Sequence, residues 1–148
     1  MHMTVLPSTD QVRRLEESLT LVNLFFRRHR DAVERRYQIS AQELDLIQFV
    51  VQNGPQKMKD VSEHFQLKFS TLTSIIDKAE RRKLLKRSNS RDDRRVVLLE
   101  VTRKGRAIYD AYDDYLQQAV QLMQSRLPQE QFEQFVQGVE VFTRMALN

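Results

Sequence analysis

The chain has 148 residues, of which 41% are hydrophobic and 30% charged, a composition that fits one soluble globular domain and excludes a disordered chain. It contains no cysteine, which excludes disulfides, thiolate catalysis and Cys-ligated zinc, and its three histidines are scattered, so we expect no metal site and no cofactor. No apolar run approaches the roughly 18–20 residues of a membrane span, and no basic segment leads into an apolar one at the N-terminus, so we expect a cytoplasmic protein without membrane contact.

The net charge of +4 is unevenly distributed along the chain. Residues 68–106 carry 13 basic and 5 acidic side chains, whereas residues 1–67 carry 9 of each and residues 107–148 carry 2 basic and 6 acidic. A basic middle segment is typical of a surface that binds polyanions, although a solvated basic helix face without a partner explains charge alone equally well.

The first segment predicts a long helix over about residues 10–36. Apolar side chains recur there every three or four residues, and the stripe is wider than a two-stranded coiled coil needs. Ser40 and Glu43 then form a capping-box pattern, which predicts a second helix that ends at Asn53-Gly54-Pro55.

Two short helices follow, and they predict a helix-turn-helix. Apolar spacing predicts a two-turn helix from Met58 to Phe65 and a second helix over about residues 69–83, separated by Gln66-Leu67-Lys68. The outer face of the second helix carries small hydroxyls early and cations later, as a helix in a DNA groove would. Its candidate DNA-binding residues are Ser70, Thr71, Thr73, Ser74 and Lys78.

A β-hairpin comes next, with strands predicted at residues 84–88 and 96–101. The polar segment between them is rich in arginine and predicts a wing with guanidinium groups at its tip. The candidate DNA-binding residues there are Arg91, Arg94 and Arg95. Thr102 is a candidate N-cap for a following helix, in which Gly105 would permit a close backbone approach.

The last third predicts two more helices, the second of which starts with Pro128 at its first helical position. These helices and the first one are too apolar to stay exposed, so self-association is the natural way to bury them. The candidate dimer-interface residues are Leu15, Leu19, Val22, Phe132, Phe135, Val139 and Phe142.

Four stretches together resemble the MarR family of winged-helix transcriptional regulators: Ser70-Thr71-Leu72-Thr73, Asp77-Lys78-Ala79-Glu80, Asp93-Arg94-Arg95 and Val101-Thr102-Arg103-Lys104-Gly105. Their order and spacing fit the family over the whole chain. Lys83 departs from the pattern, because it stands where the family usually has glycine before the wing strand.

The resemblance implies a mainly α fold: a winged helix-turn-helix with a two-stranded β wing and long N- and C-terminal dimerisation helices. We expect a single domain over residues 1–148, with the winged-helix unit at about 40–106 and the dimerisation helices at about 10–36 and 107–148. The resemblance further implies a homodimer on a pseudo-palindromic duplex DNA operator, with a recognition helix in the major groove and Asp93 orienting Arg95 in the wing.

Members of the family also commonly bind a small aromatic or anionic effector that lowers DNA affinity, so we expect a repressor of that kind. Its candidate pocket residues are Phe26, His29, Arg30 and Tyr112, although packing in the core or the dimer interface is the simpler interpretation of the aromatic ones.

Binding of RNA or non-specific binding of nucleic acid is the alternative, but a single-strand binder usually interleaves exposed aromatics with cations, and residues 68–106 hold only Phe69. An enzyme is not expected, because the sequence has no nucleophile–base set, no glycine-rich phosphate loop and no metal cluster.

Overall fold

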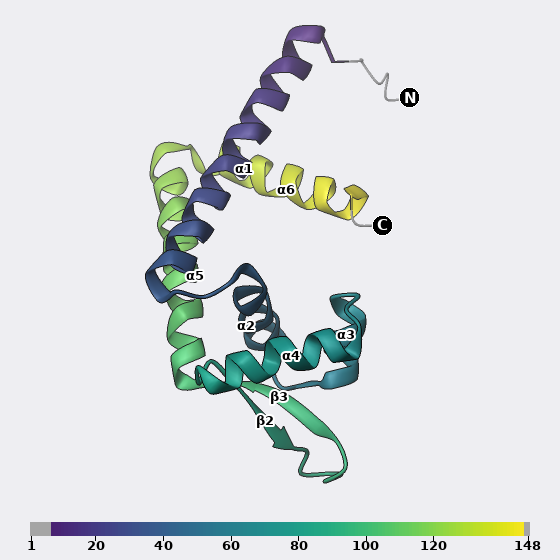
Figure 1. The fold of residues 1–148 in the computed structure, drawn as a ribbon. Coiled ribbons are helices and arrows are strands. Elements are labelled where there is room, and N and C mark those ends of the chain that lie inside the picture. The colour runs from purple at the N-terminus through teal and green to yellow at the C-terminus, as the bar shows by residue number, and fades with distance from the viewer. Residues whose placement is uncertain (1–6, 147–148) are drawn as a thin grey trace. The chain divides into compact units, whose positions relative to one another are not determined.

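The computed structural model describes residues 7–146, and most of them are helical. The elements follow in the order α1 (Thr9–Tyr37), α2 (Ala41–Asn53), β1 (Gln56–Lys57), α3 (Met58–His64), α4 (Phe69–Arg81), β2 (Leu85–Asn89), β3 (Val97–Val101), α5 (Arg103–Arg126) and α6 (Gln129–Ala146) (Figure 1). The predicted mainly α, winged helix-turn-helix fold is confirmed.

The chain divides into two compact units, and the boundary falls inside α5, between Tyr109 and Asp110. The first unit holds α1 to β3 and the start of α5. The second holds the rest of α5 and all of α6.

A capping box starts α2 as the sequence predicts. The Glu43 backbone N–H donates to the Ser40 hydroxyl at 3.2 Å, and the Ser40 backbone N–H donates to the Glu43 carboxylate at 2.8 Å. Gly54 follows the helix with φ +75°, in the region that favours glycine, and so ends it where the sequence predicts.

The wing belongs to a three-stranded antiparallel sheet with strand order β1-β3-β2. β2 and β3 pair from Leu85 opposite Val101 to Asn89 opposite Val97, and this hairpin extends away from the helices of the first unit (Figure 1). The hairpin agrees with the sequence prediction. The strand β1 was not predicted, because a strand of two residues shows no alternating pattern.

The core of the first unit lies between α2, α3, α4, the sheet and the start of α5. It consists of fully buried aliphatic side chains: Leu44, Ile47, Val61, Leu72, Ile76, Leu84, Leu99 and Ile108. Helix α4, the wing and the start of α5 therefore share one hydrophobic core, which fixes α4 and the wing relative to each other.

Two details differ from the sequence prediction. Pro128 lies just before α6, where its carbonyl accepts the Phe132 N–H at 3.0 Å, whereas it was expected at the first helical position. Lys83 adopts φ +59°, so it takes the left-handed conformation for which the family usually has glycine, and the turn keeps its geometry without one.

Candidate nucleic-acid interface

Helix α4 separates its apolar and polar side chains sharply. Leu72, Ile76 and Ala79 face the core with no exposed surface. The opposite face holds the predicted DNA-binding residues, of which Ser70, Thr71, Ser74 and Lys78 are exposed and Thr73 is half-buried. The helix is thus held by one face and offers hydroxyls and cations on the other.

Thr73 has a more restricted role than its sequence position implies. Its hydroxyl donates a hydrogen bond to the Phe69 carbonyl at 2.9 Å, one turn earlier in the helix. Because that donation uses its only O–H proton, Thr73 can offer a partner its methyl group and the lone pairs of its hydroxyl oxygen, but no donor.

Several hydrogen bonds within residues 89–96 hold the wing tip. Ser90 N–H donates to the Val96 carbonyl at 2.9 Å, Val96 N–H to the Asp93 carbonyl at 2.9 Å, and the Asn89 amide to the Arg94 carbonyl at 2.6 Å. Another runs from the Arg95 backbone N–H to the Asp93 carboxylate at 2.9 Å.

The contact between Asp93 and Arg95 therefore differs from the one that the resemblance implies. Asp93 holds the backbone of Arg95 and not its guanidinium, and so it fixes where the side chain starts. The side chains of Arg91, Arg94 and Arg95 are exposed, and none of the ion pairs among residues 7–146 includes them. Their guanidinium groups remain available to an anionic partner.

Arg87 connects the wing to α4, a contact that the sequence analysis did not identify. Its guanidinium pairs with Asp77 at 2.7 Å and also with Glu80, whose carboxylate accepts the Arg87 backbone N–H at 2.7 Å. Asp77 lies on the outer face of α4, so this ion pair fixes a polar face of the recognition helix to the first wing strand.

Arg82 makes a second structural ion pair, directly after the C-terminal end of α4. It pairs at 2.8 Å with Glu43, which is fully buried, and it donates to the carbonyls of Tyr37 and Gln38. The end of α4 is thereby attached to the corner between α1 and α2. One carboxylate oxygen of Glu43 (Oε1) is buried without a hydrogen-bond partner, so the carboxylate depends heavily on Arg82.

The wing strands carry their own polar contact on one face. The pKa of Glu100 is lowered, because the Ser88 hydroxyl and the Lys86 ammonium donate hydrogen bonds to its carboxylate; the Lys86 distance is 3.1 Å. Glu100 is ionised at neutral pH and holds the two strands together across the hairpin.

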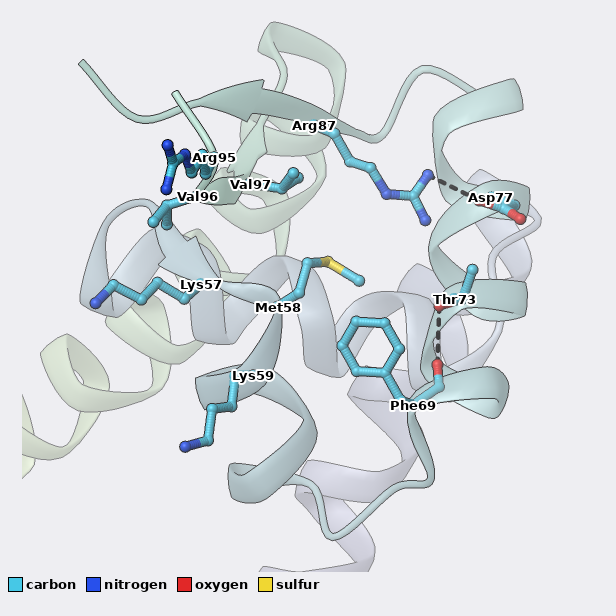
Figure 2. A pocket seen from close by; sticks show the side chains of 10 residues that line it. All are labelled: Lys57, Met58, Lys59, Phe69, Thr73, Asp77, Arg87, Arg95, Val96 and Val97. Carbon is cyan, nitrogen blue, oxygen red and sulfur yellow. Dashed lines mark hydrogen bonds and ion pairs between the residues drawn. The ribbon is translucent and has the colours of Figure 1, made fainter. Parts of the chain in front are cut away.

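A groove of about 680 Å³ lies between α3, α4 and the wing (Figure 2). Its apolar lining includes Met58, Phe69 and Val97, and Figure 2 shows the Phe69 ring beside the Met58 side chain. Three of its cations come from β1, the start of α3 and the wing: Lys57, Lys59 and Arg95. The sequence analysis noted Phe69 only as the one aromatic residue of the basic stretch.

The predicted effector residues are divided between the two units. Phe26, His29 and Arg30 lie on α1 in the first unit, with His29 buried, and Tyr112 lies on α5 in the second. Their grouping into one effector pocket stays a prediction.

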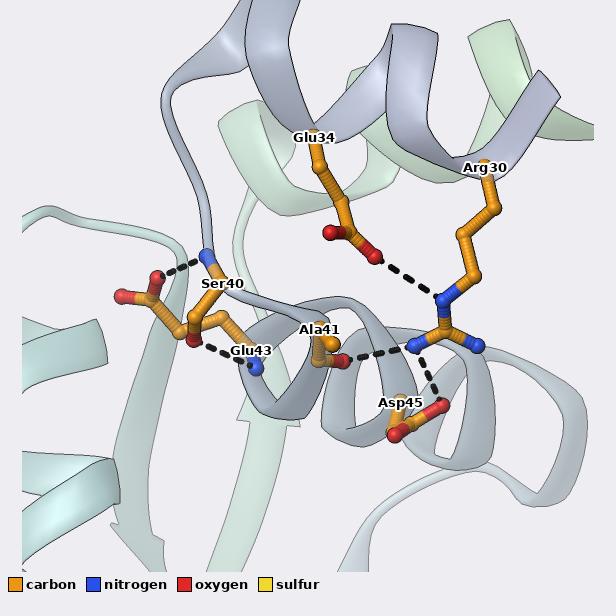
Figure 3. Close-up of polar contacts among 6 residues, drawn as sticks. All are labelled: Arg30, Glu34, Ser40, Ala41, Glu43 and Asp45. Atoms are coloured by element: carbon orange, nitrogen blue, oxygen red, sulfur yellow. Dashed lines mark hydrogen bonds and ion pairs between the residues drawn. The ribbon is translucent and has the colours of Figure 1, made fainter. Parts of the chain in front are cut away.

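Arg30 is already engaged within the first unit (Figure 3). Its guanidinium contacts the carboxylates of Glu34 at 2.9 Å and Asp45 at 2.7 Å and the Ala41 carbonyl at 2.8 Å. Although burial alone would lower the pKa of Arg30, the hydrogen bonds to Asp45 and Glu34 raise it. A residue so committed joins α1 to α2 and has little capacity left for an anionic effector.

The predicted dimer-interface residues expose much of their surface. Leu15, Leu19 and Val22 on α1 are exposed, and α6 has no buried residue among those described. Phe132 on α6 is half-buried, and Phe135, Val139 and Phe142 are exposed. Apolar faces of this size need a cover.

A family model described as the MarR family matches residues 39–97, the segment from just before α2 to the first residue of β3. Over this segment the chain is similar to the MarR family. The chain is also similar to the HTH-type transcriptional regulator MhqR of Bacillus subtilis, which is 26% identical over 140 residues, 90% of this chain and 94% of that protein.

Solved structures share the fold of this chain. FabT of Streptococcus pneumoniae, solved in complex with DNA, has a TM-score of 0.75 at 23% identity and covers 91% of this chain and 96% of its own. A MarR family protein from Bacillus stearothermophilus has a TM-score of 0.75 at 19% identity, with 97% and 100% covered.

Two further properties concern residues 7–146. No helix in that range is long and apolar enough to cross a membrane. No group of three or more His, Asp or Glu side chains within the described part of the chain is placed to hold a metal ion.

Proposed function

We propose that this protein is a homodimeric transcriptional regulator of the MarR family that binds a pseudo-palindromic site in double-stranded DNA through α4 and the wing. The observation that carries the proposal is that the outer face of α4 and the wing lie on the same hydrophobic core and are therefore presented together. The outer face of α4 offers Ser70, Thr71, Ser74 and Lys78, and the adjacent wing offers three exposed arginines that form no ion pair among the described residues. Hydroxyls read base edges and phosphates, whereas guanidinium groups suit phosphates and narrow minor grooves.

The FabT structure supports this proposal, because that protein has the same fold and was solved with DNA. We further propose that the protein acts as a repressor and that a small aromatic or anionic effector relieves it. This part rests on the family alone, since Arg30 is occupied by Glu34 and Asp45.

Selection of bound sequences from random duplex DNA tests the proposal directly. We expect a two-fold motif whose half-site centres are separated by one DNA turn, about 10 bp. Affinity should fall steeply with salt, with a log–log slope of about 5–9 in magnitude, if the two subunits contact roughly 6–10 phosphates.

Single-stranded RNA of the selected sequence serves as the comparison. Tighter binding of that RNA than of the duplex at equal salt would contradict the proposal and favour an RNA-binding protein. A salt slope near zero, or a selection that yields no motif, would also contradict it.

A further inference from the structure

Phe69 is an unusual feature of the winged-helix segment. Its ring is 57% exposed, although it stands at the first position of α4 in the most basic part of the chain. Across residues 39–109, all of which the structure describes, the large apolar side chains left exposed are Phe69 and Val97, and both line the groove between α3, α4 and the wing. The apolar surface of this segment is therefore concentrated in one place.

Thr73 extends that apolar surface along α4. Residues four apart in a helix lie on one face, so Thr73 follows Phe69 by one turn, about 6 Å along the axis. Its hydroxyl donates to the Phe69 carbonyl, which leaves the Thr73 methyl as the neighbour of the ring. Met58 packs at the other side of the ring (Figure 2).

Charge determines what this apolar strip contacts. Lys57, Lys59 and Arg95 line the same groove, so the strip is bordered by cations. A hydrophobic protein segment would have to bury these ammonium and guanidinium groups, whereas duplex DNA brings phosphates to them and apolar groups to the strip. In the major groove the apolar group is the C5-methyl of thymine, which aromatic side chains and the threonine methyl contact.

We propose that Phe69 and Thr73 form a thymine-methyl contact that determines part of the operator sequence, with the cations of the groove holding the adjacent phosphates. The inference rests on the proposed DNA-binding function and makes it more specific. Recognition helices contact base edges through their N-terminal residues. The inference adds a hydrophobic contact with thymine to the hydrogen bonds that this part of α4 can make.

Replacing thymine by uracil in the selected duplex tests the inference, because it removes the methyl group and keeps every hydrogen-bonding group of the base. Each thymine of the half-site is replaced in turn, in both half-sites at once. We expect one or two positions at which wild-type affinity falls about fourfold per half-site, which is the equilibrium effect of one buried methyl group.

Variants then assign the contact to its residues. Phe69→Ala should bring the thymine-to-uracil affinity ratio at the sensitive position close to one. Thr73→Ser keeps the hydroxyl and loses the methyl, and it should reduce the ratio at that thymine or the adjacent one. Leu122→Ala is the matched control, because Leu122 is also 57% exposed but lies on α5, and it should keep the wild-type ratio.

The outcomes separate the inference from the function on which it rests. A motif without thymine in the half-site, affinities that change less than twofold with uracil, or a Phe69→Ala variant that keeps the wild-type ratio would each overturn the inference and leave the DNA-binding function intact. A selection without any motif would overturn both.

Discussion

Arg95 stands at the junction between the wing tip and β3, with its backbone N–H held by the Asp93 carboxylate and its guanidinium exposed. This arrangement separates two functions that the sequence had assigned to one contact. Asp93 stabilises the turn, and Arg95 supplies the positive charge. A guanidinium on a fixed backbone loses less conformational entropy on binding than one on a mobile loop.

Replacing Arg95 by alanine should weaken binding to the preferred duplex and to a scrambled duplex by similar factors, because a phosphate or minor-groove contact carries little sequence information. The log–log salt slope should fall by about one per lost contact, hence by about two for a dimer. Titrations of both duplexes at several salt concentrations measure both effects.

Arg126→Ala is the control for that experiment, because it removes the same charge from the end of α5, outside the winged-helix segment. It should change neither affinity beyond twofold. If Arg95→Ala leaves both affinities unchanged while the protein stays folded and dimeric, the wing does not contact DNA through this residue.

The residues that the sequence analysis missed have long-range partners. Arg82 and Glu43 are 39 positions apart, and the contact of Arg87 with Asp77 forms only when β2 lies beside α4. No local periodicity encodes such pairs, because they depend on how finished elements pack. The capping box of Ser40 and Glu43, by contrast, is a local pattern and was predictable.

At the scale of the elements, a close backbone contact joins the start of α5 to the residues just before β2. Thr102 caps the helix, as the sequence predicts, by accepting the Gly105 N–H at 3.1 Å, and it donates to the Lys83 carbonyl at 2.6 Å. A Cβ at Gly105 would lie 2.2 Å from the Leu84 carbonyl oxygen. The glycine is therefore needed for close packing and not for an unusual backbone conformation.

Gly105→Ala should destabilise the protein by about 1–3 kcal/mol, because α5 and the backbone of Leu84 have to separate. Gly138→Ala is the matched control: nothing lies within 4 Å of its added Cβ, so helix propensity should raise stability by about 0.5–1 kcal/mol. Urea unfolding at one protein concentration measures both changes. Equal effects of the two substitutions would contradict the close contact.

Helix α4 and the wing are held together as one rigid unit. The Arg87 ion pairs fix the C-terminal part of α4 to β2, and the Arg82 ion pair fixes the same end to the corner of α1 and α2. The sequence could predict each element because its pattern repeats within a few residues. It could not predict β1, since a two-residue strand is defined by its partner β3 and not by its own composition.

The whole molecule presents apolar faces that one chain does not cover. Exposed leucine, valine and phenylalanine side chains lie along both α1 and α6. Monomeric proteins rarely expose contiguous apolar surface of this extent, and isologous pairing of two copies is the common way to bury it. Self-association was predictable from the sequence, because the apolar stripes of these helices are visible there.

The dimer is testable through α6. Full-length protein should sediment as a dimer at micromolar concentration, and deletion of residues 128–148 should give monomers or aggregates without specific DNA binding. Phe142→Glu tests the interface in the full chain, since it places a charge on the apolar face and should raise the monomer fraction while helicity by circular dichroism is retained. Gln137→Glu introduces the same charge at another exposed position of α6 and should leave the dimer intact.

Symmetry connects this assembly to DNA binding. A two-fold dimer places its recognition helices about one DNA turn apart, roughly 34–36 Å, so both half-sites of the operator are bound at once. The monomeric Phe142→Glu variant should therefore lose much of its affinity for the two-half-site operator, because it loses the high effective concentration of the second α4, yet keep wild-type affinity for an isolated half-site. Equal affinity of Phe142→Glu and Gln137→Glu for the full operator, or a full-length chain that sediments as a monomer, would show that this protein binds DNA without the symmetric arrangement proposed here.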